Sequence, residues 1–353
     1  MNIKSRNISE PAPLVEVRRG QIIESRHRGH VVAVDAEAKI IARLGQPEVT
    51  TYLRSSAKPF QAMPLVATGA ADRFGFTEKE IAIACASHNG EAIHTETVAG
   101  MLQKIGLDAS ALKCGVHEPF STEVAAALRA EGLRPTVLHN NCSGKHTGML
   151  ALALHLGAPI ETYDQMDNPV QQLILRSVSD FSGVAVEEIA LGVDGCGAPV
   201  FGVPVTAMAL MYARLVAQPE GFSDSASRKA AARIARAMTT HPEIVGGRAE
   251  RLDTKVMLAG RGAIVSKVGA EGVYTAGVLP SEAWPLGLGI AIKIEDGEDR
   301  RSRPTVVIET LRQLHILDDE AIAELAPYSR FPVRNHRGDR VGEVRASFEL
   351  GKV

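Results

Sequence analysis

The chain has 353 residues, of which 45% are hydrophobic and 4% aromatic, and its formal net charge is −2. A chain of this length can bury a large hydrophobic core. It lacks both the surplus of basic residues that neutralises phosphates and the aromatic side chains on which bases stack. The composition therefore argues against a nucleic-acid partner.

No segment predicts export or a membrane span. Residues 1–13 are polar and contain none of the apolar stretch of a signal peptide, and the longest apolar run, near residues 149–154, is too short to cross a bilayer. We therefore expect a cytoplasmic protein without a membrane partner. In that compartment the cysteines are candidates for free thiols or metal ligands rather than for disulfides. They are Cys85, Cys114, Cys142 and Cys196.

Taken in order, the chain begins with residues 1–13, which predict a flexible tail. Short β-rich runs separated by turn residues follow, and they predict antiparallel strands. These runs lie at residues 15–17, 22–26, 30–34 and 39–42.

The middle of the chain, from about residue 57 to residue 245, predicts mainly helices. Apolar residues there recur at the spacing of one helix face, and Ser121 or Thr122 is an expected helix cap. The expected helices lie at residues 60–69, 78–85, 92–105, 121–131, 144–156, 168–181, 207–216 and 225–240.

Strand patterns return near the C-terminus, so that strands stand at both ends of the chain with helices between them. This order predicts an α+β fold in which an antiparallel sheet built from both chain ends packs against the helices. We expect one catalytic domain over residues 14–353. The late strands are expected at 263–268, 273–277, 289–294 and 341–348, and the late helices at 305–316 and 318–325.

Ser55 and Lys58, in the segment Arg-Ser-Ser-Ala-Lys-Pro at residues 54–59, are the first candidates for catalysis. On a helix, residues three apart lie on one face. A neutral lysine can take the proton of a serine hydroxyl if burial or a nearby cation such as Arg54 lowers its pKa. A helix that starts just after Ser55 would also aim backbone N–H groups at a developing oxyanion. Taken alone, Ser-x-x-Lys is common, and a solvated helix face is its ordinary explanation.

Two later motifs occur in the order found in penicillin-interacting serine enzymes. Residues 87–89 read Ser-His-Asn, which places Ser87 and Asn89 in a Ser-x-Asn motif, and residues 267–269 read Lys-Val-Gly after an apolar run. The short gap between the first two motifs, and Val268 in place of a hydroxyl residue, both depart from that pattern. A plain β-lactamase or transpeptidase is therefore not the first choice.

The polar segment Asn-Asn-Cys-Ser-Gly-Lys-His-Thr-Gly at residues 140–148 is dense in reactive side chains. Cys142 precedes Lys145 by three residues near an expected helix start, and both features lower the pKa of a thiol. If Cys196 folds against Cys142, the two thiolates could hold a zinc ion together with Lys145 or His146. Buried, inert cysteines are the alternative, and Cys85 and Cys114 are interpreted in that way.

Together these motifs resemble the rhizobial-type (class 3) L-asparaginases, also called the asparaginase II family. The likeness runs over about residues 15–297, in the family's order and spacing, and the block Asn-Cys-Ser-Gly-Lys-His at residues 141–146 is the most distinctive part. The segments that carry it are 54–59, 85–88, 141–146, 194–196 and 265–269.

The resemblance implies a homodimer with a serine β-lactamase-like fold that hydrolyses L-asparagine to L-aspartate and ammonia. It implies two Ser–Lys pairs in the active site, Ser55 with Lys58 and Ser87 with Lys267. The zinc ligands that it implies are Cys142, Lys145 and Cys196. The residues expected to line the substrate site are Arg54, His146 and Asp194, with Asn89 a further candidate from the Ser-x-Asn motif.

Some relatives carry another cysteine near the site, but residues 251–254 read Arg-Leu-Asp-Thr here, with Asp253 about where that cysteine would stand.

For the reaction we expect Ser55 to attack the side-chain amide with Lys58 as general base, while Ser87 and Lys267 relay the proton. The reverse assignment of the two serines stays open.

Other functions also fit part of the pattern. A glutaminase or another small-amide hydrolase would use the same chemistry, and one methylene of difference between substrates is not read from a sequence. A penicillin-interacting serine enzyme and a non-catalytic zinc-binding or structural protein are the remaining alternatives.

Overall fold

The structure is a computed structural model that describes residues 10–248 and 251–352. Most of the tail expected at residues 1–13 lies outside the described residues. The first strand, β1 (Ala12–Arg19), includes the last two residues of that expected tail.

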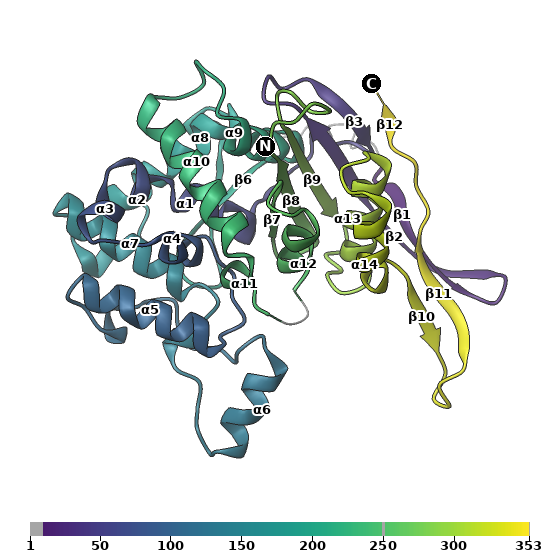
Figure 1. Ribbon diagram of the computed structural model, residues 1–353, viewed down its shortest axis with the longest axis horizontal. Helices are drawn as coiled ribbons and strands as arrows, with labels where there is room; N and C mark the ends of the chain where they lie inside the picture. The colour runs from purple at the N-terminus through teal and green to yellow at the C-terminus, as the bar shows by residue number, and fades with distance from the viewer. Residues whose placement is uncertain (1–9, 249–250, 353) are drawn as a thin grey trace, which may run out of the picture.

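An antiparallel sheet lies in the middle of the molecule (Figure 1). Within the described residues it has nine strands, in the order β10-β11-β1-β2-β9-β8-β7, with β3 beside β2 and β12 beside β3. Strands from both chain ends therefore meet in one sheet, as predicted. After β1 the bounds are β2 (Ile22–Val34), β3 (Ile40–Leu44), β7 (Ile264–Val268), β8 (Val273–Val278), β9 (Leu288–Ile294), β10 (Phe331–Arg334), β11 (Arg340–Ala346) and β12 (Gly351–Lys352).

The middle of the chain is mainly helical, which confirms the α+β prediction (Figure 1). A 3₁₀ helix, η1 (Arg54–Ala57), leads into these helices. Their bounds are α1 (Lys58–Gln61), α2 (Met63–Ala67), α3 (Ala70–Arg73), α4 (Glu78–Ala84), α5 (Ala92–Lys104), α6 (Thr122–Ala130), α7 (Ser143–Leu156), α8 (Pro169–Ser182), α9 (Val205–Ala217), α10 (Ser225–Thr240), α11 (Pro242–Val245), α12 (Leu252–Ala259), α13 (Ser302–Gln313) and α14 (Asp319–Ser329).

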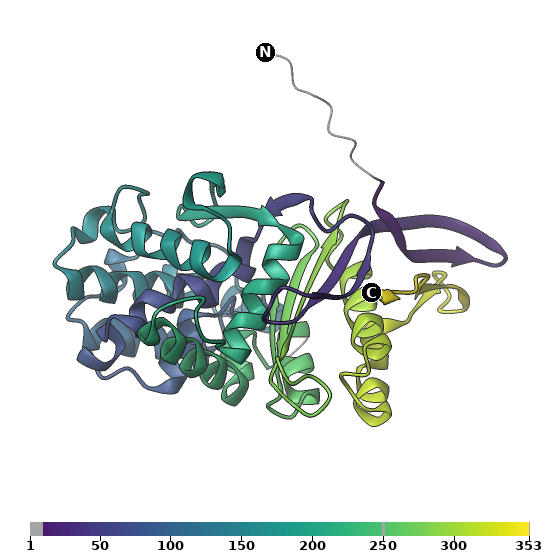
Figure 2. The same cartoon turned by 90° about the horizontal axis from the view of Figure 1, so that it is seen from above.

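The sheet separates two apolar cores. Helix α9 packs across β2, β8 and β9 on one face, where the core continues into the helical part of the chain. Helices α12, α13 and α14 cover the other face with a second core. Figure 2 shows the sheet between the helical part on one side and the C-terminal helices on the other.

Two elements differ from the predicted pattern for local reasons. The runs at 22–26 and 30–34 form one long strand, because β1 pairs with the first half of β2 and β9 pairs with its second half. The helix expected at 60–69 is divided into α1 and α2, because Pro64 stands in the first turn of α2 and cannot continue the hydrogen bonding of α1.

The structure contains a small second sheet that the sequence did not predict. It has the strand order β4-β6-β5, with β4 at Thr50–Tyr52, β6 at Pro199–Pro204 and β5 at Ala190–Val193. Its strands are short and come from distant parts of the chain, so that local periodicity carries little sign of their pairing. This sheet places the chain after β4 next to the turn after β5.

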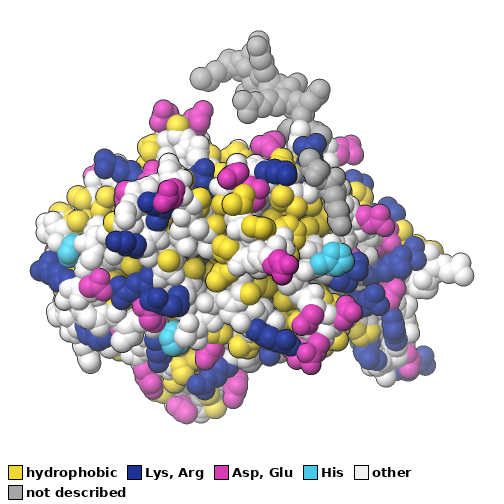
Figure 3. Space-filling view, turned by 45° about the horizontal axis from the view of Figure 1, so that its top comes forward, with side chains coloured by type: hydrophobic (Ala, Val, Ile, Leu, Met, Phe, Trp, Pro, Cys, Tyr) yellow, Lys and Arg dark blue, Asp and Glu magenta, His cyan; other side chains and the backbone are white. Residues whose placement is uncertain are grey.

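The surface agrees with the balanced charge of the sequence. Figure 3 shows basic and acidic side chains interspersed over the visible face, with apolar side chains among them. Within the residues that the structure describes, none of the helices combines the length and apolar character needed to cross a bilayer.

The contact between α9 and the sheet depends on two glycines that face each other on neighbouring strands, Gly277 and Gly289. A Cβ atom at Gly289 would lie 1.8 Å from the carbonyl oxygen of Ala209, and one at Gly277 would lie 2.8 Å from that of Tyr212. Only glycine therefore lets the backbone of α9 lie this close to β8 and β9.

We expect Gly289→Ala to lower the free energy of unfolding by at least about 3 kcal/mol, because the new methyl group must push backbone away from backbone. Urea denaturation measures this loss. Gly100→Ala is the matched control: Gly100 lies on α5 with open space around it, so alanine there should leave stability unchanged or raise it by about 1 kcal/mol. Equal effects of the two substitutions would contradict the close contact.

Candidate active site

The candidate site begins at a strained turn. Arg54 lies two residues after the end of β4 and has a φ of 51°, the left-handed conformation that costs energy for residues other than glycine. Its Nε atom donates a hydrogen bond of 2.9 Å to Oδ1 of Asp194, which lies in the turn after β5. The small second sheet therefore brings these two predicted site residues together.

Lys58 is the centre of a buried hydrogen-bond cluster. Its side chain is 1% exposed, and Nζ donates to the carbonyl oxygen of Ala86 at 2.6 Å and to Oγ of Ser87 at 2.8 Å. The carbonyl and side-chain oxygens of Asn141 lie at 3.2 and 3.3 Å from Nζ. Burial lowers the pKa of Lys58 below its ordinary value. Arg54 was expected to lower that pKa, but its charge is paired with Asp194 instead.

Ser55 lies on η1 one turn before Lys58 and is partly exposed, whereas Ser87 is 3% exposed. The neighbouring Ser56 ties η1 to the large sheet, since its Oγ donates to the carbonyl oxygen of Lys267 on β7 at 3.3 Å. The turn that carries Ser55 is thereby placed between the helical part of the molecule and the edge strand of the sheet.

Lys267 is fully buried on β7, and its nearest charged partner is also buried. Its Nζ donates to the carbonyl oxygen of Val268 at 3.2 Å and lies 3.6 Å from Oδ2 of Asp253. Burial lowers the pKa of Lys267 to about 7, although the charge of Asp253 opposes that shift. An amine of this pKa can accept and donate protons near neutral pH.

The contacts in the structure differ from the expected division into two Ser–Lys pairs. Ser87 contacts Lys58 rather than Lys267, because the loop after α4 is held by a hydrogen bond from the Ser87 N–H to the carbonyl oxygen of Val245. Among the described residues Lys267 has Asp253 as its partner, and the Ser55 hydroxyl has no hydrogen bond. Of the four predicted residues, the structure joins only Ser87 and Lys58 by a hydrogen bond between their side chains.

The predicted cysteine cluster is present at the start of α7. Cys142 and Cys196 are free thiols buried beside each other, and Lys145 Nζ donates to the sulfur of Cys196 at 3.0 Å. The contact with Cys196 lowers the pKa of Cys142 well below its usual value and raises that of Cys196. Burial opposes charge on Lys145, but the two sulfurs raise its pKa.

A glycine allows this cluster to form. Gly144 is the second residue of α7, and a Cβ atom there would lie 2.4 Å from the carbonyl oxygen of Ile83 on α4. Helix α7 can therefore begin in contact with the end of α4, the helix that leads to Ser87. This contact places Cys142 and Lys145 close to Lys58.

The remaining predicted residues have different surroundings. His146 is fully buried, with Nδ1 at 2.8 Å from the Tyr163 hydroxyl, and burial lowers its pKa to about 4. Asn89 is also buried, and its carboxamide accepts from Arg251 at 3.1 Å and donates to Glu91 at 3.2 Å. Arg54 and Asp194 keep side-chain exposures of 28% and 15%. Of these four residues, Arg54 and Asp194 are the charged ones with partly exposed side chains.

Several residues of the site were given no role by the sequence. Asn141 stands within the most distinctive motif and supplies two oxygens to Lys58. His117 accepts the backbone N–H of Asn141 at 3.0 Å from a loop 24 residues earlier. No motif or spacing marked His117, since only the tertiary structure brings it to Asn141.

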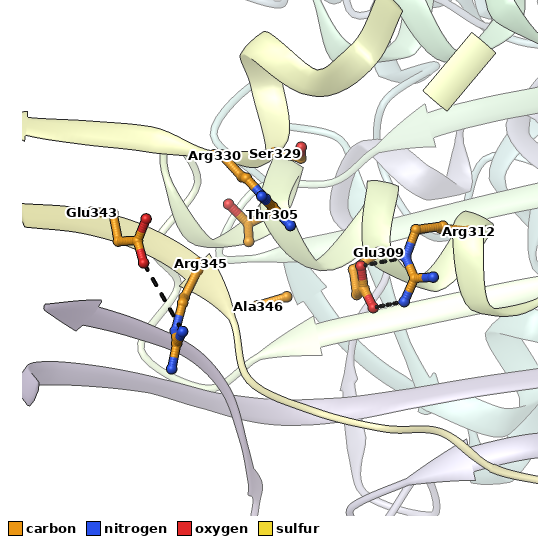
Figure 4. Close-up of a pocket in the computed structure, with 8 residues that line it drawn as sticks. All are labelled: Thr305, Glu309, Arg312, Ser329, Arg330, Glu343, Arg345 and Ala346. Carbon is orange, nitrogen blue, oxygen red and sulfur yellow. Dashed lines mark hydrogen bonds and ion pairs between the residues drawn. The ribbon is translucent and has the colours of Figure 1, made fainter. Parts of the chain in front are cut away.

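A pocket of about 290 Å³ lies elsewhere, between α13, α14 and β11 (Figure 4). Its charged side chains are mostly paired with one another: Glu309 binds Arg312 in a bidentate contact, and Glu343 faces Arg345. It contains none of the predicted catalytic residues. The candidate site is therefore the Lys58 cluster, not this pocket.

The donor atoms near Cys142 suit zinc only if lysine is counted. Within residues 10–248 and 251–352, no three side chains of His, Cys, Asp or Glu are grouped so as to hold a metal ion. Two sulfurs and the amine of Lys145 do lie together, and Nε2 of His146 is buried without a hydrogen-bond partner in the described structure. Thiolate and nitrogen donors are those that zinc prefers.

Comparison with known proteins identifies the family. The family model described as L-asparaginase II matches residues 15–346. No curated protein matches the sequence. The match covers every predicted catalytic and metal-ligating residue.

Solved structures give only a distant likeness. A probable glutaminase from Bacillus subtilis, complexed with 6-diazo-5-oxo-L-norleucine, is 13% identical with a TM-score of 0.37, over 82% of this chain and 85% of that one. A Bacillus subtilis glutaminase in covalent complex with 5-oxo-L-norleucine is 14% identical with a TM-score of 0.38, over 86% and 93% of the two chains. Similarity at this level does not establish an activity.

The strained turn at Arg54 leads to a test by substitution. Arg54→Gly and Arg54→Ala both lose the bond to Asp194, but only alanine keeps the cost of a left-handed backbone. We expect the glycine variant to be more stable than the alanine variant by about 1 kcal/mol in urea denaturation. At Glu96, an exposed position on α5, the order should reverse by a similar amount. The same order at both positions would contradict the positive φ.

Proposed function

Because the chain belongs to the L-asparaginase II family of amidohydrolases, we propose that it hydrolyses the side-chain amide of L-asparagine to L-aspartate and ammonia. The observation that best supports this proposal is the buried amine of Lys58, which lies 2.8 Å from Ser87 Oγ and one turn from Ser55. A serine hydroxyl beside a desolvated lysine is the arrangement that activates serine for attack on an amide.

Ser55 is the proposed nucleophile. It is the more exposed of the two serines, so substrate can reach it, and the strained residue before it resembles the sharp turns that present nucleophiles in other hydrolases. Its Oγ bonds to the amide carbon of asparagine as its proton passes to Lys58. The carbon–nitrogen bond then breaks, and ammonia leaves with a proton returned from the cluster. Water hydrolyses the resulting ester and releases aspartate.

Ser87 and Lys267 are proposed to carry protons rather than to attack. Ser87 is buried and already hydrogen-bonded to Lys58, which allows a proton to pass between them. Lys267, with a pKa of about 7, can hold or release a proton at neutral pH.

The ion pair of Arg54 and Asp194 is the proposed anchor for the substrate's α-carboxylate and α-ammonium groups. Both side chains are partly exposed, and Arg54 lies next to Ser55 in the sequence. A zwitterionic amino acid can exchange each partner of this pair for a group of its own. Asn89 is hydrogen-bonded to Arg251 and Glu91, and His146 is fully buried. These two residues are proposed to shape the site instead of binding the charged groups of the substrate.

We further propose that zinc binds at Cys142, Lys145 and Cys196. A bound zinc ion would supply positive charge near the substrate and fix the start of α7. The low pKa of Cys142 favours the thiolate that zinc requires. The homodimer and the cytoplasmic location expected from the sequence remain predictions.

Ammonia release from the purified full chain tests the activity. With L-asparagine we expect steady release of one ammonia for each aspartate formed, and much slower release with L-glutamine at equal concentration. Faster release from glutamine would assign the site to a glutaminase. No release from either, together with acylation by a penicillin-type probe, would overturn the proposal in favour of the β-lactam-binding alternative.

Serine variants in the same assay test the division of roles. Ser55→Ala should lose about 10³-fold or more in kcat and form no acyl-enzyme in quenched-flow mass spectrometry. Ser87→Ala should lose about 10²-fold and still become acylated. Ser266→Ala is the control, since this buried serine next to Lys267 bonds to Tyr274 at 2.9 Å. Acylation of Ser55→Ala but not of Ser87→Ala would exchange the two roles.

Zinc content tests the metal site independently of activity. Protein exposed to zinc and then dialysed should keep about one ion per chain by inductively coupled plasma mass spectrometry. Cys142→Ser and Cys196→Ser should each lose most of it, because zinc holds thiolates far better than hydroxyls. Cys85→Ala should keep it, since burial raises the pKa of that thiol to about 12. Equal zinc in all four proteins would contradict the site.

A further inference from the structure

Asp253 is a carboxylate enclosed completely within the protein. Neither it nor Lys267 has any exposed side-chain surface, and their charged atoms lie 3.6 Å apart. A buried ion pair of this kind is commonly no more stabilising than apolar side chains of the same size. Its presence therefore calls for an explanation other than stability of the fold.

Asp253 is held by backbone and side chains from two elements. Its Oδ1 accepts the backbone N–H of Val268, the residue after Lys267, at 2.6 Å. Its Oδ2 accepts from Arg251 at 3.4 Å, and the residue lies in the first turn of α12, where a negative charge is favoured. One oxygen thus fixes the strand that carries Lys267, while the other faces the amine.

Two observations place Lys267 near the proposed catalytic groups. Its own carbonyl oxygen accepts from Ser56 on η1, and its charge interacts with that of Lys58. Without a nearby anion, two amines and several other cations would repel one another in a buried space. Asp253 is the carboxylate in contact with this lysine.

We propose that Asp253 is a positioning residue for the amide hydrolysis, which fixes the Lys267 amine beside the Ser55–Lys58–Ser87 cluster and keeps it able to carry a proton. This inference rests on the proposed function. Asp253 does not touch the reacting atoms; it acts through Lys267.

The chemistry requires Lys267 to exist in both protonation states. Burial favours the neutral amine, which cannot give a proton to departing ammonia, and the charge of Asp253 opposes that effect. The result is a pKa of about 7, where both forms are present at neutral pH. Removal of the carboxylate would lower the pKa of Lys267 further and leave it almost entirely neutral.

Other groups around this pair would not replace the carboxylate. Most of those that face it are cationic or are neutral at pH 7, because burial raises the pKa values of the thiol and the two phenols. The groups on the neighbouring elements are Lys58 on α1, Cys85 after α4, Tyr212 on α9, Arg251 before α12, Tyr274 on β8 and Arg303 on α13.

The test is Asp253→Asn, which keeps an oxygen for the Val268 N–H but removes the charge. We expect the pH dependence of kcat assigned to Lys267 to move to lower pH by about one unit or more, with at least about a tenfold loss at pH 7. Asp318→Asn is the control, because that exposed carboxylate pairs with Arg261 and should leave the profile unchanged. An unchanged profile in Asp253→Asn would overturn the proposal.

A second measurement needs no substrate. The titration of Lys267 can be followed by NMR of protein labelled at the lysine ε-carbon, with Lys267→Arg to assign its signal. The midpoint should fall in Asp253→Asn; a constant midpoint would refute the inference. If the wild-type protein releases no ammonia and the Lys267 midpoint is still lower in Asp253→Asn than in wild type, the proposed function alone is refuted. The electrostatic coupling of Asp253 and Lys267 would then remain in place.

The variant Asp253→Glu separates the effect of the carboxylate charge from the effect of its position. It also provides a test if Asp253→Asn does not fold. The longer side chain keeps the carboxylate but moves it by one methylene. We expect the pH profile to keep its wild-type midpoint while kcat falls about tenfold, since the amine is displaced. Wild-type kcat in this variant would show that the exact place of Lys267 is unimportant and would overturn the positioning role.

Discussion

The burial of two lysine amines away from water is the constraint on which the rest of this structure depends. Lys58 and Lys267 come from opposite halves of the molecule, the first helix of the middle region and the edge strand of the sheet. Taking an ammonium group out of water is costly unless hydrogen bonds or an opposite charge replace the solvent. Lys58 is given carbonyl oxygens and a hydroxyl, and Lys267 is given a carboxylate, so the two are solvated by the protein in different ways.

Because of that difference, the pKa values of the two buried lysines have different physical causes. Burial is the largest influence on the pKa of Lys58, and the nearby thiols partly oppose it, whereas at Lys267 it is the charge of Asp253 that opposes burial. The glycines at the helix–helix and helix–sheet contacts allow the surrounding backbone to come close enough to exclude water. Fold and chemistry are therefore coupled at Gly144, where the approach of α7 to α4 brings the cysteine cluster to Lys58.

Local patterns predicted the architecture well because most elements are long and periodic. The strands at both ends of the chain, the helices between them and the family follow from such patterns and from the motif at residues 141–146. The side-chain contacts within the site could not be predicted from these sequence patterns. The pairing of Ser87 with Lys58 depends on how the loop after α4 is held by α11, and the partner of Lys267 stands on α12, a short helix that no sequence pattern indicated. His117 and Asn141 meet only through tertiary structure, so spacing alone could not join them.

The long strand β2 also constrains how the protein comes to be folded. Its second half pairs with β9, whose residues are made about 260 positions later in the chain. Contacts between such distant segments form slowly, because a large loop must close first. During synthesis the helical middle region can become compact while the edge of β2 that pairs with β9 is still unpaired. An unpaired strand edge is prone to join other chains, so the N-terminal hairpin is the part of the nascent protein most in need of protection until the last third has been made.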